Sequence, residues 1–106
     1  MDEVRERMLE MVSKAESSEQ PLSWFEDLYR YSKRDREQIP WDWKEPHPLL
    51  VEWTNDNEAS GRALVVGSGL GEDASFLWKR GWSVTAFDIS DEAVEWARHL
   101  NKDTDI

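Results

Sequence analysis

The residues of this 106-residue chain best suited to chemistry are three alternating glycines, Gly67, Gly69 and Gly71, and one carboxylate, Asp88. Glycine has no Cβ atom, so the backbone bends sharply at such residues and a ligand approaches it within contact distance. A carboxylate that follows a glycine-rich turn by about 20 residues, at the end of the next strand, accepts hydrogen bonds from a ribose diol. These residues predict a site for a ligand that contains a nucleoside.

The segments around the glycines predict the elements that position them. An apolar run at 63–66 ends at the glycines, a helix is expected over about 72–80, and a second apolar run at 82–87 ends at Asp88. The first run does not alternate, which favours a parallel strand covered on both faces. Because the carboxyl ends of adjacent parallel strands lie side by side, we expect the segment 67–71 and Asp88 to line one crevice of a nucleotide-binding α/β sheet.

A helix is expected after the second strand, with Ser90 or Asp91 as its N-cap and with Val94, Ala97 and Leu100 on one face. The helix before that strand is expected to end at Gly81 in a left-handed C-cap.

The first 60 residues predict three helices. Residues 2–16 carry an apolar stripe, and Ser23 to Glu26 match a capping box at the start of a second helix that ends near Lys33. The basic cluster at 33–36 is interpreted as a solvated loop. A third helix is expected from Pro46–Pro48 to about Asn55. Its inward residues are predicted to be Leu49, Leu50 and Trp53.

The residues after the glycines indicate which nucleotide is bound. A dinucleotide fingerprint has its third glycine where this chain has Glu72, and Asp73 follows. Two carboxylates at a helix N-terminus repel a pyrophosphate, although they suit the helix dipole. A nucleoside ligand with a cationic sulfonium and no phosphate, S-adenosylmethionine, fits better. A nicotinamide-dependent oxidoreductase with a degenerate fingerprint is the alternative, and Glu72 argues against it.

Two segments resemble the class I S-adenosylmethionine-dependent methyltransferases. Residues 65–71 (VVGSGLG) resemble the first motif of that superfamily, and residues 84–90 (VTAFDIS) resemble the second. Asp73 after the glycines and the aromatic segment 39–42 (IPWD) are similar to the thiopurine and halide (thiol) methyltransferase branch. The resemblance implies an enzyme that transfers a methyl group from S-adenosylmethionine to a small-molecule acceptor.

The resemblance also implies roles for individual residues. It places the glycines beside the methionine part of the cofactor, Asp88 on the ribose, Ile89 against the adenine, and Trp41 as a lid. The remaining candidates for cofactor contact are Ser68, which has the small size needed between the first two glycines, and Asp73. The resemblance assigns no catalytic residue, because the residues that contact the acceptor in this family come largely from beyond the fourth strand.

The resemblance further predicts a partial sheet. The fold class expected is α/β, a Rossmann-like class I methyltransferase sheet truncated to strands 1 and 2 with an N-terminal helical cap. We expect one partial domain over 1–106, with the cap at 1–60 and the cofactor-binding half at 61–106. Such a fragment of a longer methyltransferase is expected to be inactive alone and to form a homodimer through its open strand edges. A non-catalytic assembly module that uses the same open edge is a further alternative.

Composition excludes several classes of partner. Lys and Arg total 13 against 23 for Asp and Glu, which gives a net charge of -10 and argues against nucleic acid binding. The chain has no cysteine and two histidines, so no metal site is expected. No apolar run is long enough to span a membrane, and the N-terminus (MDEVRERM) does not resemble a signal or transit peptide. A cytoplasmic protein without a membrane partner is expected.

Overall fold

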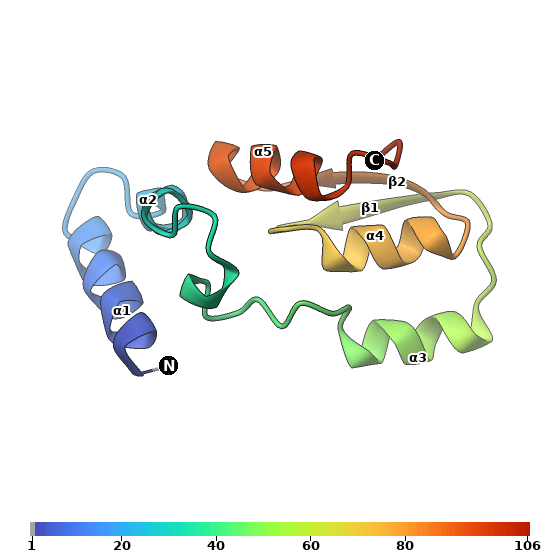
Figure 1. Cartoon of the computed structure of the whole chain (residues 1–106), viewed down its shortest axis with the longest axis horizontal. Helices are drawn as coiled ribbons and strands as arrows, with labels where there is room; N and C mark the ends of the chain where they lie inside the picture. Colours follow the sequence, from blue (N-terminus) through green and yellow to red (C-terminus); the bar gives the residue numbers. More distant parts are fainter. Residues whose placement is uncertain (1) are drawn as a thin grey trace.

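The computed structural model describes residues 2–106. Several helices come first, and two parallel strands, each followed by a helix, come after them (Figure 1). The helices before the sheet are α1 (Asp2–Glu16), α2 (Ser23–Tyr31), the short 3-10 helix η1 (Arg36–Gln38) and α3 (Pro48–Asp56). They are followed by β1 (Arg62–Val66), α4 (Glu72–Lys79), β2 (Ser83–Phe87) and α5 (Asp91–Leu100).

The two strands pair in parallel, with Arg62 opposite Ser83 and Val66 opposite Phe87. Helix α4 makes the connection between them, and Gly81 leads out of it with a φ of 100°. This strand–helix–strand unit confirms the predicted α/β fold class. It brings the carboxyl ends of β1 and β2, where the predicted site residues stand, to the same edge of the sheet.

Only one face of the sheet is covered by the described residues. Ala74 and Leu77 of α4 pack against Val84, and the side chains on the same face of both strands join this cluster. On the opposite face the exposed fractions are 64% for Leu64 and 67% for Val66. The prediction that the first strand is covered on both faces is therefore wrong for residues 2–106. The physical reason is that the crossover places α4 on one face and no other described element lies on the second.

A second apolar cluster joins the N-terminal helices to the far end of the chain. Its buried members are Leu28, Tyr29, Ile39, Leu70, Ala93 and Trp96. They come from α2, the segment after η1, the glycine turn and α5. The buried side of α5 is thus Ala93 and Trp96, whereas Leu100 of the predicted face is exposed.

The capping box predicted at the start of α2 is wrong. Ser23 makes no side-chain capping bond there, and the Glu26 carboxylate instead accepts hydrogen bonds from the Ser90 hydroxyl at 2.6 Å and from the Glu92 N–H at 2.9 Å. Of the two predicted N-caps of α5, Ser90 and Asp91, the structure selects Ser90, whose Oγ accepts from the Ala93 N–H at 3.0 Å. The Glu26 carboxylate thus caps α5 and not its own helix.

Helix α3 is less buried than predicted. Leu49 and Trp53, both expected inward, are exposed, and only Leu50 of the three packs against the cluster beside the sheet. Figure 1 shows this helix at the margin of the molecule, and Thr54 is its buried residue. The Trp53 ring lies 6.0 Å from the Trp82 ring, which is the contact that this side chain retains.

Candidate functional site

The turn after β1 requires glycine at each predicted position. The φ angles of Gly67, Gly69 and Gly71 are 63°, 54° and 89°, all in the left-handed region that disfavours side chains. Two of these residues are also closely approached. A Cβ atom at Gly69 would stand 3.2 Å from the Tyr29 hydroxyl, and one at Gly71 would stand 2.9 Å from Asn101 Nδ2. The backbone of the turn is therefore open to a ligand on one side and closely packed on the other.

The turn and the end of β2 meet through Asp88. Its Oδ2 accepts a hydrogen bond from the Gly69 N–H at 2.9 Å, and its Oδ1 accepts from the Ser90 N–H at 3.0 Å. The structure therefore brings the glycine turn and this aspartate into direct contact. A carboxylate offers about four acceptor positions, so each oxygen keeps one for a ligand hydroxyl.

A first cavity of about 240 Å³ lies over the glycine turn. Three aromatic side chains, Tyr29, Trp41 and Trp43, form part of its wall. Apart from Tyr29, its titratable lining consists of four carboxylates and one histidine: Asp42, Glu45, Glu72, Asp73 and His47. Asp42 and Glu72 are paired with Arg36, so the negative charge that this cavity offers to a cationic group comes mainly from Glu45 and Asp73.

A second cavity of about 410 Å³ lies at the end of β2. Its walls are mainly apolar and consist of Phe25, Tyr29, Trp41, Val66, Gly67, Phe87, Asp88 and Ile89. This cavity suits a ligand that has a flat apolar ring next to a hydroxyl-bearing group, because the aromatic walls pack on the ring and the carboxylate accepts from the hydroxyl.

Tyr29 and Trp41 line both cavities. The Trp41 Nε1–H donates a hydrogen bond to the Tyr29 hydroxyl at 3.1 Å, and the rings meet edge to face with their centroids 5.9 Å apart. Burial raises the pKa of Tyr29 to about 12, and the neighbouring carboxylates of Asp88 and Asp42 add to the rise, against the hydrogen bond from Trp41. Tyr29 is therefore a neutral phenol near pH 7 and does not act as a base there.

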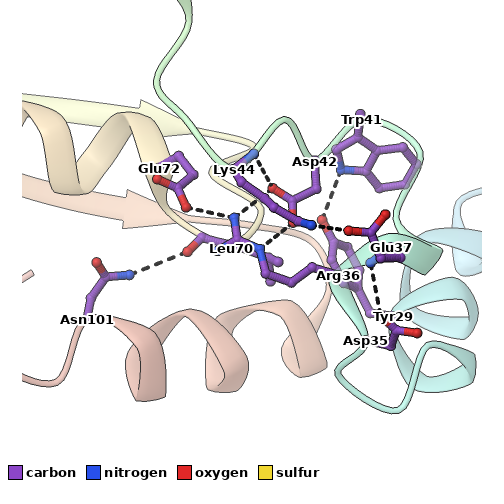
Figure 2. Close-up of polar contacts among 10 residues, drawn as sticks. All are labelled: Tyr29, Asp35, Arg36, Glu37, Trp41, Asp42, Lys44, Leu70, Glu72 and Asn101. Carbon is purple, nitrogen blue, oxygen red and sulfur yellow. Dashed lines mark hydrogen bonds and ion pairs between the residues drawn. The ribbon is translucent and has the colours of Figure 1, made fainter.

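Arg36 connects three parts of the site (Figure 2). Its guanidinium donates to both carboxylate oxygens of Asp42, at 2.5 and 2.7 Å, and to Glu72 Oε1 at 2.7 Å. Hydrogen bonding to Asp42 raises the pKa of Arg36 above its ordinary value. Burial favours a higher pKa for Asp42, but the bonds from Arg36 and the Lys44 N–H outweigh it and lower that pKa. The prediction of a solvated loop at 33–36 is therefore wrong for Arg36.

Three other predicted site residues lie around the two cavities. The Asp73 Oδ1 accepts a hydrogen bond from the His47 N–H at 2.8 Å. Ser68 donates through its hydroxyl to the Phe87 carbonyl at 3.2 Å, and Ile89 stands exposed at the rim of the second cavity. Their contact with a cofactor stays a prediction.

Sequence reasoning missed part of this site. Asp42 stands inside an aromatic segment, and a charged residue in such surroundings was a usable signal. Phe25 and Tyr29 stand one helical turn apart on α2, a spacing that packing alone explains. Arg36 gave no signal, since its partner Glu72 is 36 positions away.

Within residues 2–106, no group of three or more His, Asp and Glu side chains is arranged to hold a metal ion. None of the helices in that range is both long and apolar enough to cross a membrane.

A family model described as thiopurine S-methyltransferase matches residues 28–104, which is more than half of the chain. The matched range includes Tyr29, the segment with Trp41, the glycine turn and Asp88. No match is found among curated proteins.

Proposed function

This chain belongs to the thiopurine S-methyltransferase family of S-adenosylmethionine-dependent methyltransferases, and we propose that its two neighbouring cavities hold S-adenosylmethionine. The observation that carries the proposal is the hydrogen bond from Gly69 to Asp88, which joins the glycine turn to the strand-end carboxylate at the border of both cavities.

Each part of the cofactor has a matching set of side chains. The adenine lies in the apolar second cavity against Ile89 and Phe87, and the ribose hydroxyls donate to Asp88. The methionine part extends along Gly67, Ser68 and Gly69 into the first cavity, and Gly71 supports the turn behind it, where it packs against Asn101. The acids of that cavity suit the sulfonium and the ammonium of this ligand, and they would repel a pyrophosphate.

Methyl transfer requires little acid–base chemistry from the protein. The bound cofactor supplies an electrophilic methyl group, and the residues of this chain hold it in one orientation and exclude water. Trp41, whose ring lies over Tyr29, serves as the lid on the cofactor. The acceptor in this proposal is a small molecule, which the description of the matching family model as a thiopurine methyltransferase supports.

We propose in addition that these 106 residues bind the cofactor without methylating an acceptor on their own. The face of the sheet that carries Leu64 and Val66 is uncovered within residues 2–106, so the cleft has no wall on that side to hold an acceptor in line. Turnover by the purified chain with any acceptor would contradict this.

A homodimer forms through the open edge and the exposed face of the sheet in this proposal. Leu64, Val66 and Phe87 are apolar and exposed, and β1 pairs with β2 along one edge alone among the described residues. A second copy presents the same edge and the same apolar side chains, so a two-fold related pairing buries both sets together.

Calorimetric titration with S-adenosylmethionine and S-adenosylhomocysteine tests the cofactor assignment. We expect saturable binding by the native chain and a loss of at least about tenfold in affinity in Asp88→Asn, which removes the charge that a ribose diol favours. Asp91→Asn is the matched control, since it makes the same change at an exposed residue three positions away. No binding by the folded native chain, or equal affinities for the two variants, would overturn the proposal.

A further inference from the structure

The segment from Arg36 to His47 faces the glycine turn across the first cavity. Ile39, Trp41, Asp42, Trp43, Glu45 and His47 line the cavity on the side of this segment, and Gly67–Leu70 with Glu72 and Asp73 line it on the other. The position of the 36–47 segment therefore sets the shape of the cavity.

Both ends of the 36–47 segment are tied to two adjacent residues of α4. At one end the Arg36 guanidinium donates to Glu72 at 2.7 Å, and at the other the His47 N–H donates to Asp73 at 2.8 Å. The acids that follow the glycine turn are thus engaged by the chain itself. These bonds give Glu72 and Asp73 a structural role in addition to their negative charge at the cavity wall.

Arg36 also fixes the middle of the segment. Its fork binds both oxygens of Asp42, and Asp42 Oδ1 accepts a further bond from the Lys44 N–H at 3.0 Å. Lys44 has a φ of 60°, a left-handed conformation that a non-glycine residue keeps only when its surroundings hold it. Trp41, which lines both cavities, directly precedes Asp42. It is therefore held next to the contact between Asp42 and the Arg36 guanidinium (Figure 2).

The ion pair between Arg36 and Asp42 is largely shielded from water. The side chain of Asp42 is 5% exposed, and that of Arg36 is 23% exposed. Bidentate contacts between a guanidinium and a carboxylate are stronger and more directional than single ion pairs, and shielding increases their effect. A lysine at position 36 would keep the charge but could not donate to Asp42 and Glu72 in the same geometry.

We propose that Arg36 is a positioning residue: through Asp42 and Glu72 it holds the 36–47 segment, and with it Trp41, over the glycine turn, and thereby sets how tightly the cleft retains its ligand. Glu72 is the partner on α4 for this purpose. The effect on the ligand rests on the proposed binding of S-adenosylmethionine, whereas the effect on the segment does not.

The first measurement uses the ligand-free chain. Hydrogen–deuterium exchange followed by mass spectrometry reports the opening of the peptide that spans 36–47, which includes the Lys44 and His47 amides. We expect exchange in this peptide to be faster by about fivefold in Glu72→Gln and in Arg36→Lys. Glu92→Gln is the matched control, because it removes the same charge from the Arg34–Glu92 pair, whose two residues lie outside both cavities. Equal exchange in Glu72→Gln and the control would overturn the inference whether or not the cofactor binds.

The second measurement is the affinity for S-adenosylmethionine, determined by calorimetry on the same variants. We expect Glu72→Gln and Arg36→Lys to bind about five- to tenfold more weakly, with thermal midpoints equal to that of Glu92→Gln. Affinity equal to that of the native chain would overturn the proposed effect on the ligand. Faster exchange in a native fold that binds no S-adenosylmethionine would support the positioning by Arg36 and refute the proposed function, so the two failures are distinguishable.

Discussion

The carboxylate of Asp88 and the backbone N–H of Gly69 stand 2.9 Å apart and are hydrogen-bonded. This bond connects the end of β2 to the turn after β1. Because a side chain at position 69 would approach Tyr29, the same glycine also determines how closely α2 packs on the turn. One residue thus sets the distance between the carboxylate, the turn and the aromatic wall.

Substitution of Gly69 by alanine is expected to be more damaging than substitution of Gly67. Both residues have φ angles in the left-handed region, so each alanine costs about 1 kcal/mol of unfolding free energy from the backbone alone. At Gly67 a Cβ atom would meet nothing within 4 Å, but at Gly69 it would stand 3.2 Å from the Tyr29 hydroxyl. Denaturant unfolding of both variants measures the difference. Equal free energies of unfolding for the two variants would show that Tyr29 moves away from the added methyl group without loss of stability.

Glu26 is expected to stabilise the fold in a pH-dependent way. Burial favours a higher pKa for Glu26, but the bonds from Ser90, the Glu92 N–H and Arg30 outweigh it and lower the pKa below its ordinary value of 4.5. A depressed folded-state pKa adds stability above the unfolded-state value, and this stability is lost as the pH falls through the folded-state pKa.

Unfolding of Glu26→Gln at several pH values tests this dependence. At pH 7 the variant is expected to be less stable than the native chain by about 1 kcal/mol, since the amide keeps an acceptor but loses the charge. The difference should shrink as the pH falls below about 4.5. Asp27→Asn, an exposed neighbour on α2, serves as the control. A difference between Glu26→Gln and the native chain that is constant from pH 7 to pH 3 would contradict the role given to the charge.

Tyr29 is expected to ionise at unusually high pH. In Tyr31→Phe it is the only tyrosine left, since the chain has two. Its absorbance should then change near pH 12, above its ordinary value of 10.0. A raised pKa of this kind contributes stability that is complete below pH 10 and declines as the pH rises toward 12. Circular dichroism recorded alongside shows whether the fold persists. Ionisation near pH 10 in a chain that is still folded would rule out the buried phenol.

The exposed face of the sheet leads to a prediction about assembly. Leu64→Lys places a charge where a second copy would pack, so we expect the dimer to dissociate about tenfold or more readily in sedimentation experiments. Leu49→Lys is the control, because Leu49 is equally exposed but lies on α3, away from the sheet. A native chain that stays monomeric at micromolar concentration would refute the homodimer.

The parts of the fold that the sequence predicted are local ones. The glycine turn, the helix after it and the strand that ends at Asp88 follow one another within residues 61–90, so their spacing alone indicated the crevice. The sequence indicated Ser90 as one of two candidate N-caps for the same reason, since its partner Ala93 is three positions away.

The parts that the sequence did not predict depend on distant partners. Glu26 matched a capping box for its own helix, but its partners Ser90 and Glu92 are 64 and 66 positions away. Arg36 resembled a solvated basic residue, because its partner Glu72 is 36 positions away and the local sequence does not indicate their contact. The exposure of Leu64 and Val66 was not predicted either. An apolar strand sequence indicates that the strand tends to be buried, but it does not indicate which element packs on each face.

The bond between Glu26 and Ser90 also bears on the order in which the chain folds. Helix α2 emerges from the ribosome well before Ala93 and Trp96, the residues of α5 against which it packs. Closing so long a loop is slow, so we expect α2 to stay exposed to proteases in nascent chains that end before Ser90 and to become resistant once α5 has emerged. The N-terminal helices would then depend on the completion of α5 to survive synthesis.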